Sequence, residues 1–337
     1  MKVGVRGSSF DLLAFRGLPG KRRKRFAQAS TEPLAVHPVN RLAQQIHPAK
    51  LNLMVTEVRD ETPSSKSFRL MPNPAGQVSV LPTFRAGQYL SLMVALDDAR
   101  TTRPYSISSA PCEALGEDRF YEISMQRVEN GFLTEHAWDN WKIGTVVESS
   151  GPTGLFYHDP LRDSRRVVGL AGGAGITPFR SIAREIAFGS LDAELLLYGS
   201  SDEGDILFYD ELQELEEEAD GALQVVHVLS CDEVCLEGCE QGFITADLIR
   251  KYADTANSSL FVCGPQVMYD YVRGELAKLE LPRRRVRWEL YGERKDIARR
   301  PGFPSETVGK AFALTVHLNG VAHQVPAKAT ETVLVAT

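Results

Sequence analysis

The strongest constraint on the fold is a regular alternation of strand-like and helix-like segments between residues 165 and 292. Four times a short apolar run precedes a longer amphipathic segment, as in RVVGLAG before TPFRSIAREIAFG. In that segment Phe179, Ile182 and Ile186 follow the spacing of a helix that buries one face. A fifth strand-like run, RVRWELYG, comes after the last helix. Because crossovers between parallel strands are right-handed, the alternation predicts a five-stranded, doubly wound parallel sheet covered by helices.

Residues 51–160 have a different pattern. Short runs rich in β-branched and aromatic residues are separated by Pro, Gly and Asn at close spacing, which is typical of an antiparallel barrel or sandwich. We therefore expect an antiparallel β-barrel over 49–160 and an α/β domain over 161–293. The barrel runs are LNLMVTEVRD, SFRLMP, QYLSLMVAL, RPYSISS, FYEISMQRV and GTVVESSGP.

A glycine-rich turn follows the first strand of the parallel sheet, where ligands bind in sheets of this kind. In GLAGGAGITPF, the glycines at 172, 173 and 175 allow backbone N–H groups to approach a phosphate. We expect Thr177 to cap the next helix and Pro178 to occupy its first turn. The alternative is a tight strand-to-helix turn that binds nothing.

A second candidate segment is TRPYSISSAP in the barrel. Arg103 is a planar cation suited to a pyrophosphate, Tyr105 offers a flat face, and Ser106 can make one short hydrogen bond. Side-chain alternation places Arg103 and Tyr105 on one side of the strand and Ser106 on the other. The alternative is an ordinary barrel strand with a surface arginine.

Taken together and in order, these motifs resemble the ferredoxin–NADP reductase family of flavoprotein reductases over residues 50–292. RPYS resembles the flavin-binding signature, and NGFLT followed by GPTGLF resembles the segment that holds the flavin pyrophosphate. GGAGITP resembles the nicotinamide pyrophosphate loop, and VCGPQVMY resembles the segment beside the nicotinamide. The cofactor-binding residues that this resemblance implies are Arg103, Pro104, Tyr105, Ser106, Gly131, Thr134, Gly172, Gly173, Gly175, Thr177, Ser200, Ser201, Cys263, Gly264, Pro265 and Met268.

The resemblance implies an NAD(P)H-dependent, FAD-containing reductase. Hydride would pass from the nicotinamide to flavin N5, and single electrons would then leave for a redox protein or iron–sulfur acceptor. The implied catalytic residues are Ser106 near N5, Cys263 in the nicotinamide pocket, and Glu289 in RWELYGE as a proton-handling group. Alternatives that remain open are a flavin-binding docking subunit with little turnover, a free-flavin reductase, and the reductase component of an oxygenase or desaturase.

Two short segments bear on which cofactors the protein uses, NADH or NADPH and FAD or FMN. After the second sheet strand, LYGSSDEGD has Ser200, Ser201, Asp202 and Glu203 where NADPH-preferring relatives often carry an arginine. Carboxylates there repel a 2′-phosphate, so we expect NADH, with NADPH as the alternative. Thr134 implies a second phosphate clamp, which favours FAD over FMN.

Charge is distributed unevenly along the chain. Residues 1–50 hold ten basic and two acidic residues, whereas the remainder holds 28 basic and 42 acidic residues, a net charge of −14. Such an acidic body argues against nucleic-acid binding. We expect residues 1–48, which contain KRRKRF, to be largely disordered; the alternative is an arm for an acidic partner or an anionic membrane surface. No run is long and apolar enough for a signal peptide or a membrane span, so we expect a cytoplasmic protein.

Three of the five cysteines, Cys231, Cys235 and Cys239, form a C-x3-C-x3-C run. This spacing matches neither zinc ribbons nor ferredoxins, and no fourth ligand is evident nearby. We therefore expect surface thiols without a metal, and a redox or metal role is the alternative.

Near the end of the chain, ALTVHLNGVAHQV predicts a hairpin with a tight turn at Asn319–Gly320. The charged stretch 294–312 before it is expected to be a linker. Several reductases of the family continue into a plant-type ferredoxin domain that opens with such a hairpin, and this resemblance implies that ETVLVA then starts a helix. We therefore expect residues 313–337 to be an incomplete ferredoxin-like domain, with its 2Fe–2S cluster only in a longer parent chain, because no cysteine follows Cys263. The alternative is a hairpin that packs on the reductase as a true terminus.

Overall fold

The computed structural model describes most of the chain, which divides into two compact units, Met1–Gln44 and Gln45–Thr337. Within the described part of the chain, every helix is too short or too polar to span a bilayer. The described residues are 9–28, 39–40, 42–43, 48, 50–76, 80–96, 99–129, 131–189, 191, 195–231, 236–291, 297–299, 302–318 and 321–336.

The first unit contains helix α1 (Ser9–Ala27), whereas the sequence led us to expect a largely disordered arm. The helix is rich in Leu, Ala, Lys and Arg, which have high helix propensity, although Pro19 interrupts its interior. Lys24 and Arg25 lie in the last turn, where the helix dipole favours cations.

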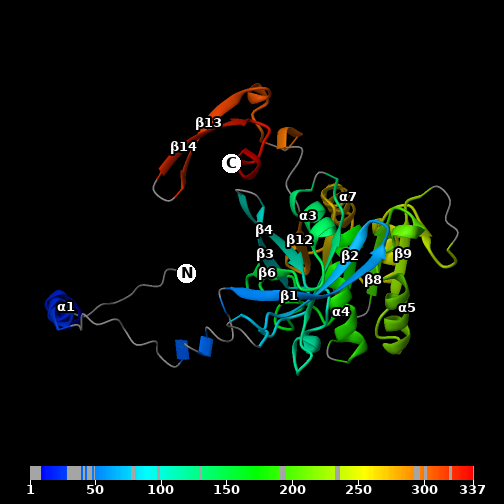
Figure 1. The fold of residues 1–337 in the computed structure, drawn as a ribbon, viewed down its shortest axis with the longest axis horizontal. Helices are drawn as coiled ribbons and strands as arrows, with labels where there is room; N and C mark the ends of the chain where they lie inside the picture. Colours follow the sequence, from blue (N-terminus) through cyan, green and yellow to red (C-terminus); the bar gives the residue numbers. More distant parts are fainter. Residues whose placement is uncertain are drawn as a thin grey trace. The chain divides into compact units, whose positions relative to one another are not determined.

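The second unit begins with the predicted antiparallel barrel (Figure 1). Leu51, Leu53 and Val55 of the first strand are fully buried, which is the period-2 pattern of a strand with one face in the core. The sheet order is β4-β3-β6-β1-β2-β5, and an antiparallel bridge between Ile107 and Ile123 closes the two edges. The strands are β1 (Leu51–Thr62), β2 (Ser65–Pro72), β3 (Tyr89–Leu96), β4 (Ala99–Ser106), β5 (Tyr121–Gln126) and β6 (Val146–Ser149), with helix α3 (Phe132–Asn140) between β5 and β6.

The parallel sheet follows, with order β10-β9-β8-β7-β11-β12. It has six strands instead of the expected five, because β10 pairs two residues with the end of β9 and is too short to leave a periodic signal. Helices α4 and α5 pack on one face and α6 and α7 on the other, so the sheet is doubly wound as predicted. The elements are β7 (Arg166–Gly172), α4 (Thr177–Ala187), β8 (Leu195–Ser200), α5 (Tyr209–Glu218), β9 (Val225–Leu229), β10 (Glu240–Gln241), α6 (Ala246–Tyr252), β11 (Ser258–Gly264), α7 (Gln266–Ala277) and β12 (Val286–Leu290).

The predicted C-terminal hairpin is present as β13 (Ala311–Leu318) paired antiparallel with β14 (Val321–Lys328). Helix α8 (Val333–Ala336) follows, as the resemblance to a ferredoxin domain implied. The turn residues Asn319 and Gly320 lie outside the described residues.

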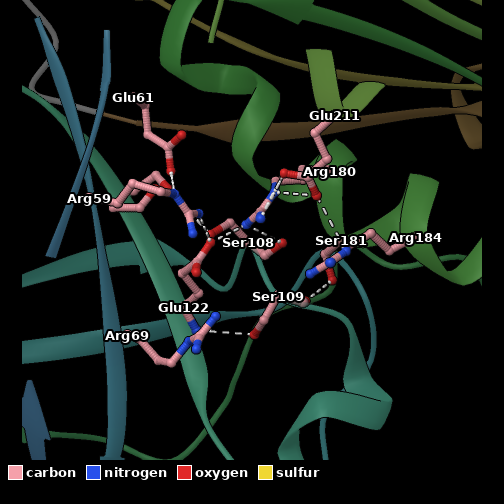
Figure 2. A network of polar contacts seen from close by, with 12 residues as sticks. Arg59, Glu61, Arg69, Ser108, Ser109, Glu122, Arg180, Ser181, Arg184 and Glu211 are labelled. Atoms are coloured by element: carbon pink, nitrogen blue, oxygen red, sulfur yellow. Dashed lines mark hydrogen bonds and ion pairs between the residues drawn. The ribbon is translucent and has the colours of Figure 1, made fainter. Parts of the chain in front are cut away.

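A buried ion pair joins the barrel to the parallel sheet (Figure 2). Arg180 of α4 contacts Glu122 of β5 through a charged hydrogen bond, and each side chain is 3% exposed. The guanidinium also donates to Glu211 of α5 at 2.9 Å and to the Ser108 carbonyl at 3.3 Å. Arg59 of β1 approaches Glu122 to 3.1 Å from the barrel side.

These contacts decide the charge states of the pair. Burial by itself would raise the pKa of Glu122, but Arg180, Arg59 and Arg69 outweigh it and lower the pKa. Burial would likewise lower the pKa of Arg180, and Glu122 and Glu211 reverse that effect. Both groups are therefore charged at neutral pH, and neither can lose its partner without leaving a buried charge.

Two flanking contacts extend this junction. Next to Arg180, the Ser181 hydroxyl donates to the Ser109 carbonyl at 2.6 Å. On the other side, Asp205 of the parallel-sheet domain accepts from Thr62 at the end of β1 at 2.7 Å and from Ser64 in the following turn at 2.6 Å. The barrel and the sheet are thus held together at several points on either side of the buried pair.

We expect Glu122→Gln to destabilise the protein by about 3–5 kcal/mol, because Arg180 is left buried without its main counter-charge. The loss of stability should be greatest above pH 5, where Glu122 is charged in the wild type. It should shrink as the pH falls through the lowered pKa of Glu122, because the wild type then loses the same charge. Urea unfolding at several pH values measures both effects. Arg250→Ala, which breaks an exposed ion pair with Asp247, is the control and should cost less than about 1 kcal/mol; equal losses in the two variants would contradict this account.

Candidate active site between the barrel and the parallel sheet

The glycine-rich turn leads directly from β7 into α4. A 3-10 turn over Gly173–Ile176 precedes the helix, and Pro178 lies in its first turn as predicted. The expected cap is wrong in detail: Ile176 occupies the N-cap position, and the Thr177 hydroxyl donates to the Ala174 carbonyl at 3.0 Å. The 3-10 turn moves the start of the helix by one residue, so Thr177 is already helical.

The glycines are required because the turn packs directly against the end of β11. A Cβ at Gly175 would lie 2.3 Å from the Cys263 carbonyl oxygen, and one at Gly172 would lie 2.5 Å from the Met268 sulfur. Gly173 differs, since it has φ of +50° and nothing closer to its Cβ position than a Gln126 oxygen at 4.0 Å. The turn is therefore closed toward β11 and open at Gly173, which fits a phosphate group at the start of α4.

The RPYS residues lie at the end of β4. Arg103 is half-buried and donates to the Thr101 hydroxyl at 2.7 Å, while Pro104 is exposed. Burial raises the pKa of Tyr105 to about 12, so its phenol is neutral. Ser106 is buried, and its hydroxyl contacts the hydroxyl of Tyr291, the residue that follows β12.

Tyr291 is a candidate site residue that the sequence reasoning missed. Its pKa is raised by burial first and then by the nearby Cys263 and Glu289. The available signal was its place directly after a strand of the parallel sheet, two residues beyond Glu289. Through Tyr291 the last sheet strand reaches the flavin-signature strand of the barrel.

Cys263 and Glu289 are partners in register on the neighbouring strands β11 and β12. Cys263 is fully buried, and burial raises its pKa well above the usual value, with Glu289 adding to the shift. Burial raises the pKa of Glu289 to about 7, so this carboxyl can hold or release a proton near neutral pH. Gly264 ends β11, and the exposed Pro265 is the N-cap of α7.

The second expected flavin segment divides into two parts with different surroundings. Gly131 is the N-cap of α3, and the Thr134 hydroxyl accepts from the Val128 N–H at 3.3 Å; Asn130 lies outside the described residues. The free N–H groups of this first helical turn fit a second phosphate. Phe156 of GPTGLF instead packs in the core of the parallel-sheet domain, 5.6 Å from Phe179 between ring centroids.

The loop after β8 carries the residues expected at the nucleotide ribose. The Ser200 side chain is buried beside Tyr198, whereas Ser201 and Asp202 are exposed. The Glu203 carboxylate instead accepts a hydrogen bond from the Leu236 N–H at 2.9 Å. A buried hydroxyl beside an exposed carboxylate fits a ribose with free hydroxyls.

The cysteine run lies next to the loop after β8, since the Leu236 N–H donates to Glu203. Cys231 and Cys239 are partly buried against the core of the parallel-sheet domain, and Cys235 lies outside the described residues. Burial and the nearby Glu203 raise the pKa of Cys239, which makes this thiol less reactive.

The packing of the glycine turn can be tested by adding one methyl group. Gly175→Ala should cost about 2 kcal/mol or more in urea unfolding, because its Cβ would overlap the Cys263 carbonyl. Gly274→Ala in the interior of α7 has open space around its Cβ and should instead stabilise the protein by about 0.5–1 kcal/mol. The account is wrong if the two substitutions change stability in the same direction.

Comparison with known proteins agrees with the two halves of this arrangement. Residues 53–158 match the oxidoreductase FAD-binding domain, and residues 170–274 match the oxidoreductase NAD-binding domain. Ferredoxin–NADP reductase B of Sorangium cellulosum is 34% identical over 217 residues, covering 62% of this chain and 85% of that protein.

Two further matches extend the comparison. The ferredoxin reductase component of 3-ketosteroid-9-alpha-monooxygenase from Mycobacterium tuberculosis is 28% identical over 246 residues, covering 72% of this chain and 65% of that protein. Phthalate dioxygenase reductase has the same fold, with a TM-score of 0.60 and 24% identity over 85% of this chain and 78% of its own. Several curated relatives are longer, and the chain spans 61% of a Rhodopirellula baltica flavohemoprotein. By its paired domains and its relatives, the chain belongs to the ferredoxin–NADP reductase family of flavoprotein reductases.

Proposed function

We propose that this protein is an electron-transfer reductase that takes reducing equivalents from NADH through FAD to a redox protein. The observation that carries the proposal is the contact between Ser106 of the flavin-signature strand and Tyr291 at the end of the last sheet strand. This contact supports the proposal because Cys263 and Glu289, the residues expected on the nicotinamide side, lie near Tyr291.

The residues have separate roles in this proposal. When bound, the flavin accepts two electrons at once from a nicotinamide and can release them singly. Ser106 would supply a hydroxyl to the bound flavin, and its hydroxyl contacts that of Tyr291 at the end of the parallel sheet. Glu289 holds a proton near neutral pH because its pKa is about 7. The protonated thiol of Cys263 shapes the pocket without acting as a nucleophile.

A protein acceptor is supported by the relatives. Besides the monooxygenase reductase component, the electron transfer component of 2-halobenzoate 1,2-dioxygenase from Burkholderia cepacia is 27% identical over 258 residues. The order of hairpin β13–β14 and helix α8 supports an iron–sulfur acceptor, because a plant-type ferredoxin domain opens in this order. The expected domain boundaries, cytoplasmic location and acidic partner of the N-terminal arm stay predictions.

Anaerobic mixing with NADH tests the reaction directly. The flavin of the FAD-loaded protein should bleach within seconds, and Ser106→Ala should slow bleaching by about tenfold or more at unchanged flavin content. Ser67→Ala is the control, because it removes an equally buried barrel hydroxyl whose partner is Ser124. Absence of bleaching in the wild type would favour a docking subunit, and release of reduced flavin from the protein would favour a free-flavin reductase.

The preference for NADH rests on Asp202. Its exposed carboxylate lies in the loop where NADPH-preferring relatives often carry an arginine, so Asp202→Arg should raise kcat/KM for NADPH by about tenfold and lower the NADH preference. Asp118→Arg, an exposed aspartate in the barrel, controls for the change in net charge. A wild-type preference for NADPH would overturn this part of the proposal.

A further inference from the structure

The edge of the parallel sheet opposite the cofactor loops is rich in arginine. Two short segments, LRDSRR before β7 and PRRRVR leading into β12, contribute seven arginines in a chain whose net charge is −6. Strand β11 pairs with both β7 and β12, and its register sets Ser258 beside Arg166 and Leu260 beside Val286. The parallel topology therefore brings both segments to the same edge. These arginines are Arg162, Arg165, Arg166, Arg283, Arg284, Arg285 and Arg287.

Asp163 ties the two segments together. Its fully buried carboxylate accepts from Arg162 of the first segment at 2.9 Å and from Arg287 of the second at 2.5 Å. The Arg287 guanidinium also donates to the Arg284 carbonyl at 2.9 Å, which holds the arginine turn in place. Asp163 is thus saturated by two of the arginines and neutralises none of the others.

A cavity of about 450 Å³ opens where the segments meet. Three arginines against one aspartate give its lining a net positive charge. Arg283, next to the cavity, and Arg284, in its wall, have no side-chain partner among the described residues, and Arg285 contacts the Ala256 carbonyl with one of its nitrogens. The lining residues are Leu161, Arg162, Asp163, Ser164, Arg284 and Arg285.

We propose that this cavity is a binding site for a small phosphate-bearing anion, separate from the coenzyme site. Unpaired guanidinium groups present forked N–H donors that match phosphate oxygens, and the Ser164 hydroxyl supplies a further donor. The volume lies in the range of small-ligand pockets. Because the protein as a whole is acidic, a compact phosphate ligand fits this local positive surface better than a nucleic acid does.

The site is distinct from the cofactor loops by position. Strand β7 runs from Arg166 at the arginine edge to Gly172 at the glycine turn, a length of seven residues. At the rise of an extended strand, the two ends are about 20 Å apart. A ligand here would leave the junction of barrel and sheet open to NADH.

Calorimetric titration of the FAD-loaded full-length protein with inorganic pyrophosphate at low ionic strength tests the proposal. Saturating NAD⁺ is present throughout to occupy the coenzyme loop. We expect one binding event that Arg284→Ala weakens by about tenfold and Arg284→Glu abolishes. Arg299→Ala is the control, because it removes another exposed arginine that lies outside the cavity. NADH-dependent flavin bleaching should be unchanged in all three variants.

Two results would overturn the proposal. One is the absence of pyrophosphate binding once NAD⁺ is saturating, which would assign any binding to the coenzyme loop. The other is equal affinity in Arg284→Glu and the wild type, which would show that the arginine edge does not bind the anion. Neither result depends on whether NADH reduces the flavin, so the proposed function is tested independently.

Discussion

The buried pair of Glu122 and Arg180 is the interaction on which the geometry of this reductase depends. It joins a barrel strand to the helix that starts at the glycine turn, and both charges lie in a region that excludes water. Ser108 and Ser109, which follow the flavin-signature strand, bond to Arg180 and Ser181 on that helix. The barrel and the parallel sheet are therefore linked within a few residues of the RPYS motif and of the glycine turn, the two segments expected to hold the cofactors.

Close backbone packing supplies the second constraint. The glycine turn lies against the end of β11 so closely that a methyl group at Gly175 would overlap the Cys263 carbonyl. This contact places the glycine turn beside Cys263, and the register of β11 with β12 places Glu289 beside Cys263. Parallel strands end together, so residues far apart in the chain gather at one edge, and the arginines gather at the other.

Periodicity predicted the fold well because each element has one buried face. The spacing of Phe179, Ile182 and Ile186 identified α4, and six β-rich runs identified the six barrel strands. The prediction failed where no periodic pattern exists: β10 is two residues long, and the 3-10 turn shifts the start of α4 so that Thr177 is not its cap. Helix α1 was missed because its charge-rich sequence resembles that of disordered tails.

By itself the sequence determined the order of domains, the two cofactor motifs and the chemistry available to them, since all of these are local along the chain. It could not show that Tyr291 meets Ser106, that Glu122 and Arg180 pair, or that burial moves the pKa of Glu289 to about 7. Each of these depends on segments that are distant in the chain and meet only in the folded protein. Burial and partner charges exist only in three dimensions, so the tertiary structure decided how the site is assembled.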